Sequence, residues 1–124
     1  MSVVVGLCQI TLHLPGNRSL KGKRQVVKKL CDRVRHRFHV SIAEVADLDR
    51  HQRACVGLAV VGNETSFVHS VLDTILNAID EMQLAPILDR QTEILHYDEQ
   101  FAQDHPLVDQ HADGWDFMSE WEDD

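Results

Sequence analysis

The sequence predicts an α+β domain in which two helices cover one face of a four-stranded antiparallel sheet. Apolar residues recur with a period of two in residues 3–14, as expected for a strand. They recur at helical spacing in residues 20–38 and 64–83. Two short apolar runs, 40–45 and 54–61, lie between the helical segments and are expected to pair as a hairpin. A last strand after the second helix completes the order β, α, β, β, α, β.

The ends of the predicted elements carry recognisable signals. Ser19 is a suitable N-cap for the first helix, and Asn63 is expected to cap the second. Pro86 ends the second helix, and a strand is expected within 87–97, centred on residues 92–96. With short right-handed connections, this order gives the ferredoxin-like sandwich, in which both helices lie on one face of the sheet.

The other face of such a sheet has no helix to cover it. On the first strand, Val3, Val5 and Leu7 alternate with the residues that face the helices, so they point to the open face. A monomer rarely leaves an apolar patch of this kind in water. We therefore expect a homodimer through the open sheet face, or burial of this face against another partner.

Charge is distributed unevenly along the chain. The net charge is −8 over 124 residues, but residues 1–62 hold eleven of the twelve lysines and arginines and only four of the twenty acids. Residues 98–124 hold ten acids and no lysine or arginine. We therefore divide the chain into a domain, 1–97, and an acidic tail, 98–124, whose composition and lack of periodicity predict disorder.

The three cysteines and the start of the sequence bear on the cellular compartment. Cys8, Cys31 and Cys55 are odd in number and lie in apolar segments, so they are expected to be reduced core residues. No basic stretch precedes the first apolar run, which is too short to be a signal peptide or to span a membrane. We expect a cytoplasmic protein that does not associate with membranes.

The first predicted helix is strongly basic. Nine lysines and arginines lie between positions 18 and 37, with a single acid, Asp32. The outer side of any amphipathic helix is charged, but that alone does not explain the absence of glutamate. A one-sided positive surface suits nucleic-acid phosphates, because neutralising them releases counterions. The residues we predict to contact nucleic acid are Arg18, Lys21, Lys23, Arg24, Lys28 and Arg35.

The acidic tail has three interpretations. It is a solvated segment, or it competes with a polyanion for the basic helix at high effective concentration. In the third, it is a linear motif that docks into a groove of a partner protein. The partner-binding residues of that motif would be the aromatic ones, Trp115, Phe117 and Trp121.

Catalytic, metal and cofactor signatures are absent from the sequence. The eight histidines do not fall at metal-ligand spacings, and no nucleophile motif or strict phosphate-binding loop is present. We predict no metal, no cofactor and no enzymatic activity. Asn17 and Arg18 are the weak candidates if the domain hydrolyses a phosphate ester. Glu44, inside a strand, is expected to face the open side or to pair with Arg53 across the hairpin.

Three segments of the sequence carry a family resemblance. They are Gly6-x-Cys8-x-x-Thr11-Leu12-His13-Leu14-Pro15, Ser19-Leu20-Lys21-x-Lys23-Arg24, and Arg37-Phe38-x-Val40-Ser41-x-Ala43-Glu44-Val45. In these segments the chain resembles the YlxP-like proteins, a bacterial family of unknown function, over about residues 3–96. The resemblance implies a ferredoxin-like fold, frequent dimers, and genes that neighbour those of translation initiation factor two and ribosome-binding factor A.

Two hypotheses of function follow. In the first, the protein is a non-enzymatic, ribosome-associated accessory protein that binds RNA through its basic helix. The gene neighbourhood implied by the resemblance favours ribosomal RNA or a ribosome-assembly protein as the partner. In the second, the protein is a dimeric interaction or regulatory module that recruits a partner through its acidic, aromatic tail.

Overall fold

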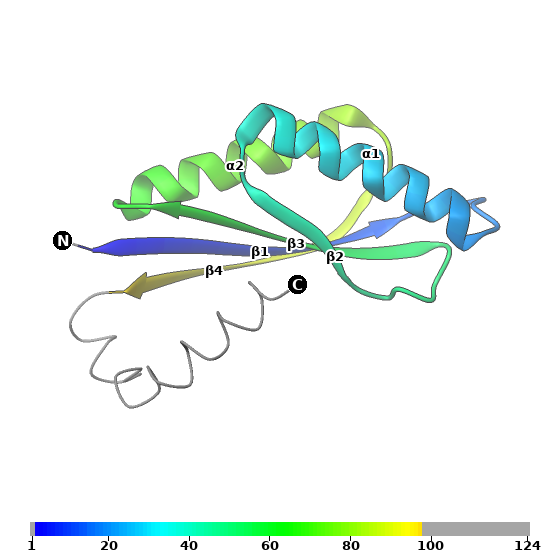
Figure 1. Ribbon diagram of the computed structural model, residues 1–124, viewed down its shortest axis with the longest axis horizontal. Helices are drawn as coiled ribbons and strands as arrows, with labels where there is room; N and C mark the ends of the chain where they lie inside the picture. Colours follow the sequence, from blue (N-terminus) through cyan, green and yellow to red (C-terminus); the bar gives the residue numbers. More distant parts are fainter. Residues whose placement is uncertain (1, 98–124) are drawn as a thin grey trace, which may run out of the picture.

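The computed structural model describes residues 2–97, which form a two-layer sandwich of one sheet and two helices (Figure 1). The elements follow the predicted order: β1 (Val3–His13), α1 (Leu20–Phe38), β2 (Ser41–Ala46), β3 (Arg53–Gly62), α2 (Thr65–Met82) and β4 (Ile87–Tyr97). The four strands are antiparallel and lie in the order β2-β3-β1-β4. The predicted ferredoxin-like arrangement is therefore confirmed.

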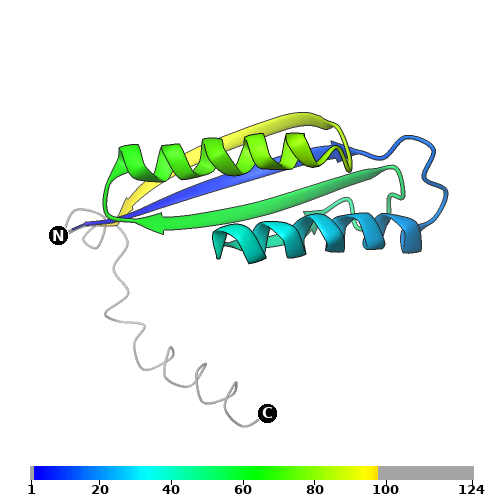
Figure 2. The ribbon, with the colours of Figure 1, turned by 90° about the horizontal axis from the view of Figure 1, so that it is seen from above.

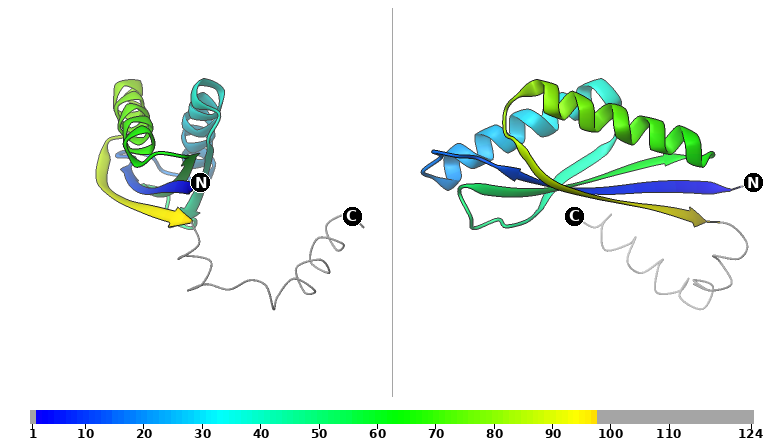
Figure 3. Two further views of the ribbon diagram at one scale, coloured as in Figure 1. Left: turned by 90° about the vertical axis from the view of Figure 1, so that its left-hand side faces the viewer. Right: turned by 180° about the vertical axis from the view of Figure 1, so that it is seen from behind.

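Both helices lie side by side on the same face of the sheet and run in opposite directions (Figures 2 and 3). The core lies between the two layers, because alternate residues of the central strands point toward the helices. On β1 these include Val4, Ile10 and Leu12, all about 1% exposed. The three cysteines are free and buried, as expected.

The helix α2 packs very closely on β1 at a glycine. A Cβ atom on Gly6 would lie 2.5 Å from Val68 Cγ1 and 2.8 Å from Leu72 Cδ1. Both side chains are fully buried in α2. The glycine thus sets how near this helix can lie to the sheet.

The two helices begin with different caps. The Ser19 hydroxyl accepts a hydrogen bond from the Gly22 N–H at 3.0 Å, which confirms Ser19 as the N-cap of α1. The expectation that Asn63 caps α2 is wrong. The first intrahelical bond runs from the Val68 N–H to the Glu64 carbonyl at 3.1 Å, so Glu64 is the N-cap, and its side chain makes no capping bond.

Candidate nucleic-acid interface

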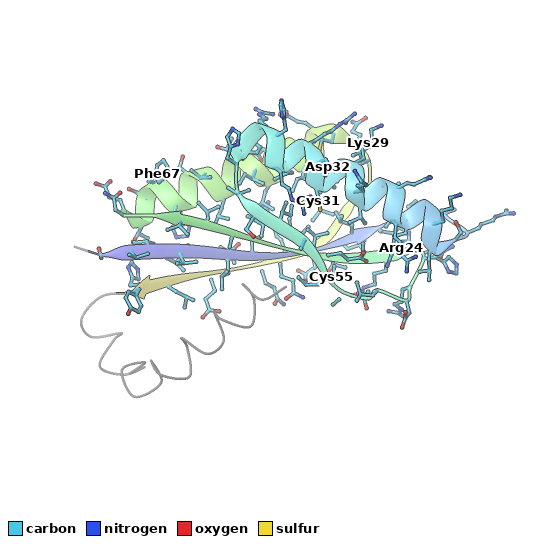
Figure 4. All side chains as sticks on the ribbon, viewed as in Figure 1. Arg24, Lys29, Cys31, Asp32, Cys55 and Phe67 are labelled. Carbon is cyan, nitrogen blue, oxygen red and sulfur yellow. The ribbon has the colours of Figure 1, made fainter. Side chains whose placement is uncertain are left out.

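The outer side of α1 is covered with positive charge. Leu30, Cys31 and Val34 turn toward the core, and the lysines and arginines, with one exception, turn to solvent. Figure 4 shows Lys29 projecting away from the sheet, whereas Cys31 lies on the side that faces it. We call the exposed set the α1 basic surface: Arg18, Lys21, Arg24, Lys28, Lys29, Arg33, Arg35 and Arg37.

Among the described residues, a single carboxylate neutralises part of this surface. Asp32 accepts from Lys28 Nζ at 2.7 Å and from Arg35 Nη1 at 3.2 Å. The hydrogen bond from Lys28, and then the charges of Lys28 and Arg35, lower the pKa of Asp32 below its ordinary value. Within residues 2–97, no carboxylate lies within 4.0 Å of the charged groups of the other six bases.

The bases of the α1 basic surface include one group in the last turn of the helix and another near its start. Arg35 and Arg37 lie in the last turn, where positive charge is favoured by the helix dipole. Arg35 also donates to the Ile42 carbonyl of β2 at 2.5 Å, so it has a structural role at the sheet edge. Lys21 and Arg24, in contrast, lie near the start of the helix, where the dipole opposes positive charge. Helix stability therefore does not explain their presence.

Lys23 does not belong to the surface, and our prediction that it contacts nucleic acid is wrong. Its side chain is 0% exposed and lies at the junction of α1 with the β2–β3 connection. The Nζ atom makes an ion pair with Glu44 Oε2 at 2.8 Å. It also donates to the carbonyls of Asp47, Leu48 and Arg53 at 2.7, 3.2 and 3.4 Å. With four oxygen partners, this ammonium is not available to a phosphate.

The same cluster corrects the expectation for Glu44. A structural ion pair was expected and is present, but the partner is Lys23 rather than Arg53. Arg53 instead pairs with Asp47 at 3.1 Å. Glu44 shares a side of β2 with the buried Ile42, so it points under α1 and not toward the open face.

The connection between β2 and β3 lies against the start of α1 and carries charges of both signs, Asp47, Asp49 and Arg50. The Asn17 amide donates to the His51 carbonyl, and Gln52 Nε2 donates to the Asn17 carbonyl at 3.4 Å. Arg50 in this connection is exposed, and no carboxylate of the described residues pairs with it. No sequence pattern indicates Arg50, because its connection comes to lie beside the start of α1 only when the chain folds back onto the helix.

A family model described as "Protein of unknown function (DUF503)" matches residues 5–92. The chain belongs to this family. It is also 36% identical over 73 residues to "Uncharacterized protein YlxP" of Bacillus subtilis (strain 168), a match that covers 59% of this chain and 77% of the relative. The resemblance to YlxP-like proteins is thereby confirmed.

The family match spans the α1 basic surface and the Lys23–Glu44 pair. It ends before residue 98, so the acidic tail lies beyond it. The tail residues predicted to bind a partner, Trp115, Phe117 and Trp121, lie outside the described part of the chain, as does the predicted disorder of the tail.

Several solved structures resemble this chain, all at low sequence identity. "Structural Genomics, protein YJCS" is 9% identical, with 72% of this chain and 96% of that chain covered and a TM-score of 0.43. The de novo designed protein LFR1 1 "with ferredoxin fold" is 13% identical, with 80% and 87% covered and a TM-score of 0.40.

The open face of the sheet contrasts with the α1 basic surface. Strand pairing places Val5 of β1 between Val61 of β3 and Leu95 of β4, and Val61 is 66% exposed. Beside this row a shallow hollow of about 690 Å³ crosses the middle of the sheet. Its lining includes small residues of β2 and β3, such as Ala43 and Gly57.

Two other types of site were considered. Among residues 2–97, no group of three or more histidine, cysteine, aspartate or glutamate side chains is placed to hold a metal ion. Neither helix in this part of the chain has the length and apolar character needed to cross a membrane.

Proposed function

We propose that this protein is a non-enzymatic accessory protein that binds RNA through the α1 basic surface. The observation that carries the proposal is the unpaired positive charge near the start of α1. Arg18, Lys21 and Arg24 are exposed, have no carboxylate partner among the described residues, and lie where the helix dipole disfavours them. Phosphate groups would supply the missing negative charge.

The residues on the open face of the sheet make this face a poor RNA-binding surface, which favours α1 as the surface that binds RNA. RNA-binding domains that use the sheet of this fold stack bases on aromatic side chains of the central strands. Strands β1 and β3 contain no phenylalanine, tyrosine or tryptophan, and β4 places Asp89 and Glu93 on the open face. Carboxylates at these positions would repel phosphates. RNA is therefore expected on the helix side, and ribosomal RNA is the first ligand to test because of the implied gene neighbourhood.

The test replaces three bases of the α1 basic surface with neutral residues. The variant carries Lys21→Gln, Arg24→Gln and Lys28→Gln, which lowers the net charge by three. We expect it to lose about tenfold or more in affinity for ribosomal RNA at low salt and to show a shallower dependence of affinity on salt. Binding is measured by co-sedimentation with ribosomal subunits and by fluorescence anisotropy with an RNA fragment at two salt concentrations.

A matched control changes the net charge equally at another place. The substitutions Ser66→Glu, Ser70→Glu and Asn77→Glu add three negative charges to exposed positions of α2. If RNA lies along α1, this control keeps most of the affinity. Equal losses in both variants would mean that only net charge matters, and unchanged binding of the α1 variant would refute the proposal.

We propose a second function, dimerisation through the open sheet face, which the apolar row at Val61 favours. Leu7 and Val61 are 38% and 66% exposed on this face, beside Val5 and Leu95. A Leu7→Glu/Val61→Glu variant is expected to sediment as a monomer under conditions in which the unmodified chain is dimeric. A monomeric unmodified chain at about 100 μM would refute this second proposal.

A further inference from the structure

We infer that the acidic tail, residues 98–124, occupies the α1 basic surface of its own chain when no nucleic acid is bound. The inference rests on the proposed function, because it names what regulates the same surface. The tail would act as a polypeptide substitute for the RNA backbone and would be displaced by it.

Charge complementarity selects α1 among the surfaces that the tail could cover. The last twelve residues, 113–124, contain six of the tail's ten acids and both tryptophans of the chain. The helix α2 contains Asp73, Asp80 and Glu81 and no lysine or arginine, and strand β4 adds Asp89 and Glu93 against one base, Arg90. These like charges disfavour the side of the molecule on which β4 lies. The α1 basic surface has eight exposed bases and a single acid, Asp32.

The length of the tail allows this contact. The strand β4 ends at Tyr97, on the edge of the sheet away from β2. Three strand spacings separate the two edges, or about 14 Å. Tyr97 pairs with Val3, whereas α1 begins after the other end of β1, so the eleven residues of β1 add about 35 Å to reach the start of α1 but much less to reach its end. The fifteen residues 98–112 reach about 20 Å as a flexible chain and about 50 Å when extended. Residues 113–124 can therefore reach the last turns of α1 with a flexible linker, and its start with a largely extended one.

The two tryptophans make the contact directly measurable in the full chain without RNA. Trp115 and Trp121 are the only tryptophans, so tryptophan fluorescence reports on the tail alone. The three native cysteines are buried, so a cysteine introduced on the surface can be labelled selectively. Gln25 on α1 and Asn77 on α2 are both exposed and uncharged. Gln25→Cys and Asn77→Cys, each with a nitroxide label, therefore form a matched pair that leaves every charge in place.

We expect the label at position 25 to quench tryptophan fluorescence several-fold more than the label at position 77 at low salt. The difference should vanish near 1 M salt, where the screening length is about 3 Å. The control is matched in position, because Asn77 lies beside residues 88–90 at the start of β4, toward the end of the sheet away from Tyr97, as does Gln25 near the start of α1. Equal quenching at the two positions, or stronger quenching at position 77, would overturn the inference.

A second measurement separates this inference from the proposed function. Conversion of the six acids of residues 113–124 to the corresponding amides keeps both tryptophans and removes the competing charge. We expect it to raise RNA affinity about tenfold at low salt, whereas Trp115→Ala/Trp121→Ala has a smaller effect. An equal gain from the tryptophan variant would overturn the electrostatic contact. If no variant binds RNA but the quenching difference is present, the proposed function fails and the tail contact stands.

Discussion

The helices α1 and α2 lie on the same face of the same sheet, yet they differ on both of their sides. On the outside, α1 carries unpaired bases, whereas α2 carries acids and no lysine or arginine. On the inside, α1 is attached near its start by the buried Lys23, whereas the buried side chains of α2, which pack on β1 and β3, are all apolar. Both helices pack on the same face of the sheet, and α2 does so without lysine or arginine. The positive charge on the outside of α1 is therefore not a requirement of the fold.

The first way to sharpen this comparison is to remove the buried charge under α1. Lys23→Met leaves Glu44 without its partner and removes one donor from three carbonyls, of which that of Asp47 keeps the Arg50 N–H, and we expect it to lower the free energy of unfolding by about 3–5 kcal/mol. Urea unfolding followed by circular dichroism measures this change. The double variant Lys23→Met/Glu44→Leu removes both charges and should recover part of the loss. A single variant within about 1 kcal/mol of the unmodified protein would show that the pair does not fasten α1.

The second test concerns the apolar attachment of α2. Gly6→Ala places a methyl group against Val68 and Leu72, and we expect it to lower the free energy of unfolding by about 1–3 kcal/mol through overpacking. Gly57→Ala is the control, because its Cβ atom lies on the open face with Val45 as the nearest contact, at 3.2 Å. The same unfolding assay applies. If Gly57→Ala lowers the free energy of unfolding as much as Gly6→Ala does, the close approach of α2 is not what restricts the size of the side chain at residue 6.

The third and smallest effect is a pH dependence that only the inner side of α1 should show. Burial raises the pKa of the Cys31 thiol above its ordinary value, an effect that the charge of Arg35 opposes. The folded state therefore keeps the thiol proton at pH values where the unfolded chain has lost it. The contribution to stability is fully present below the unfolded pKa, about 8.5, and is lost as pH rises above that value.

Cys31→Ala isolates this contribution, because it removes this thiol and leaves the other buried titratable groups, Lys23, Cys8 and Cys55, in place. We expect the urea midpoint of the unmodified protein to fall more between about pH 7 and about pH 9.5 than that of the variant. Identical slopes would show that Cys31 does not contribute to the pH dependence.

The sequence alone determined the order and extent of the elements, because the period of the apolar residues follows directly from strand and helix geometry. It also determined the positive charge of the first helix and its cap at Ser19. The spacing of Lys23 from Val27, Leu30 and Val34 even contains the signal that Lys23 lies on the buried stripe of α1. A lysine is rarely buried without a partner, however, and the helix pattern does not reveal one.

Only the tertiary structure decided which bases are available. The fold brings Glu44 and three carbonyls of the β2–β3 connection to Lys23, and it brings Arg50 to the start of α1. These contacts join residues more than twenty positions apart, so no local pattern encodes them. The helix periodicity assigned charge to α1 as a whole, and the burial of a single ammonium by distant oxygens determined which part of that charge faces solvent.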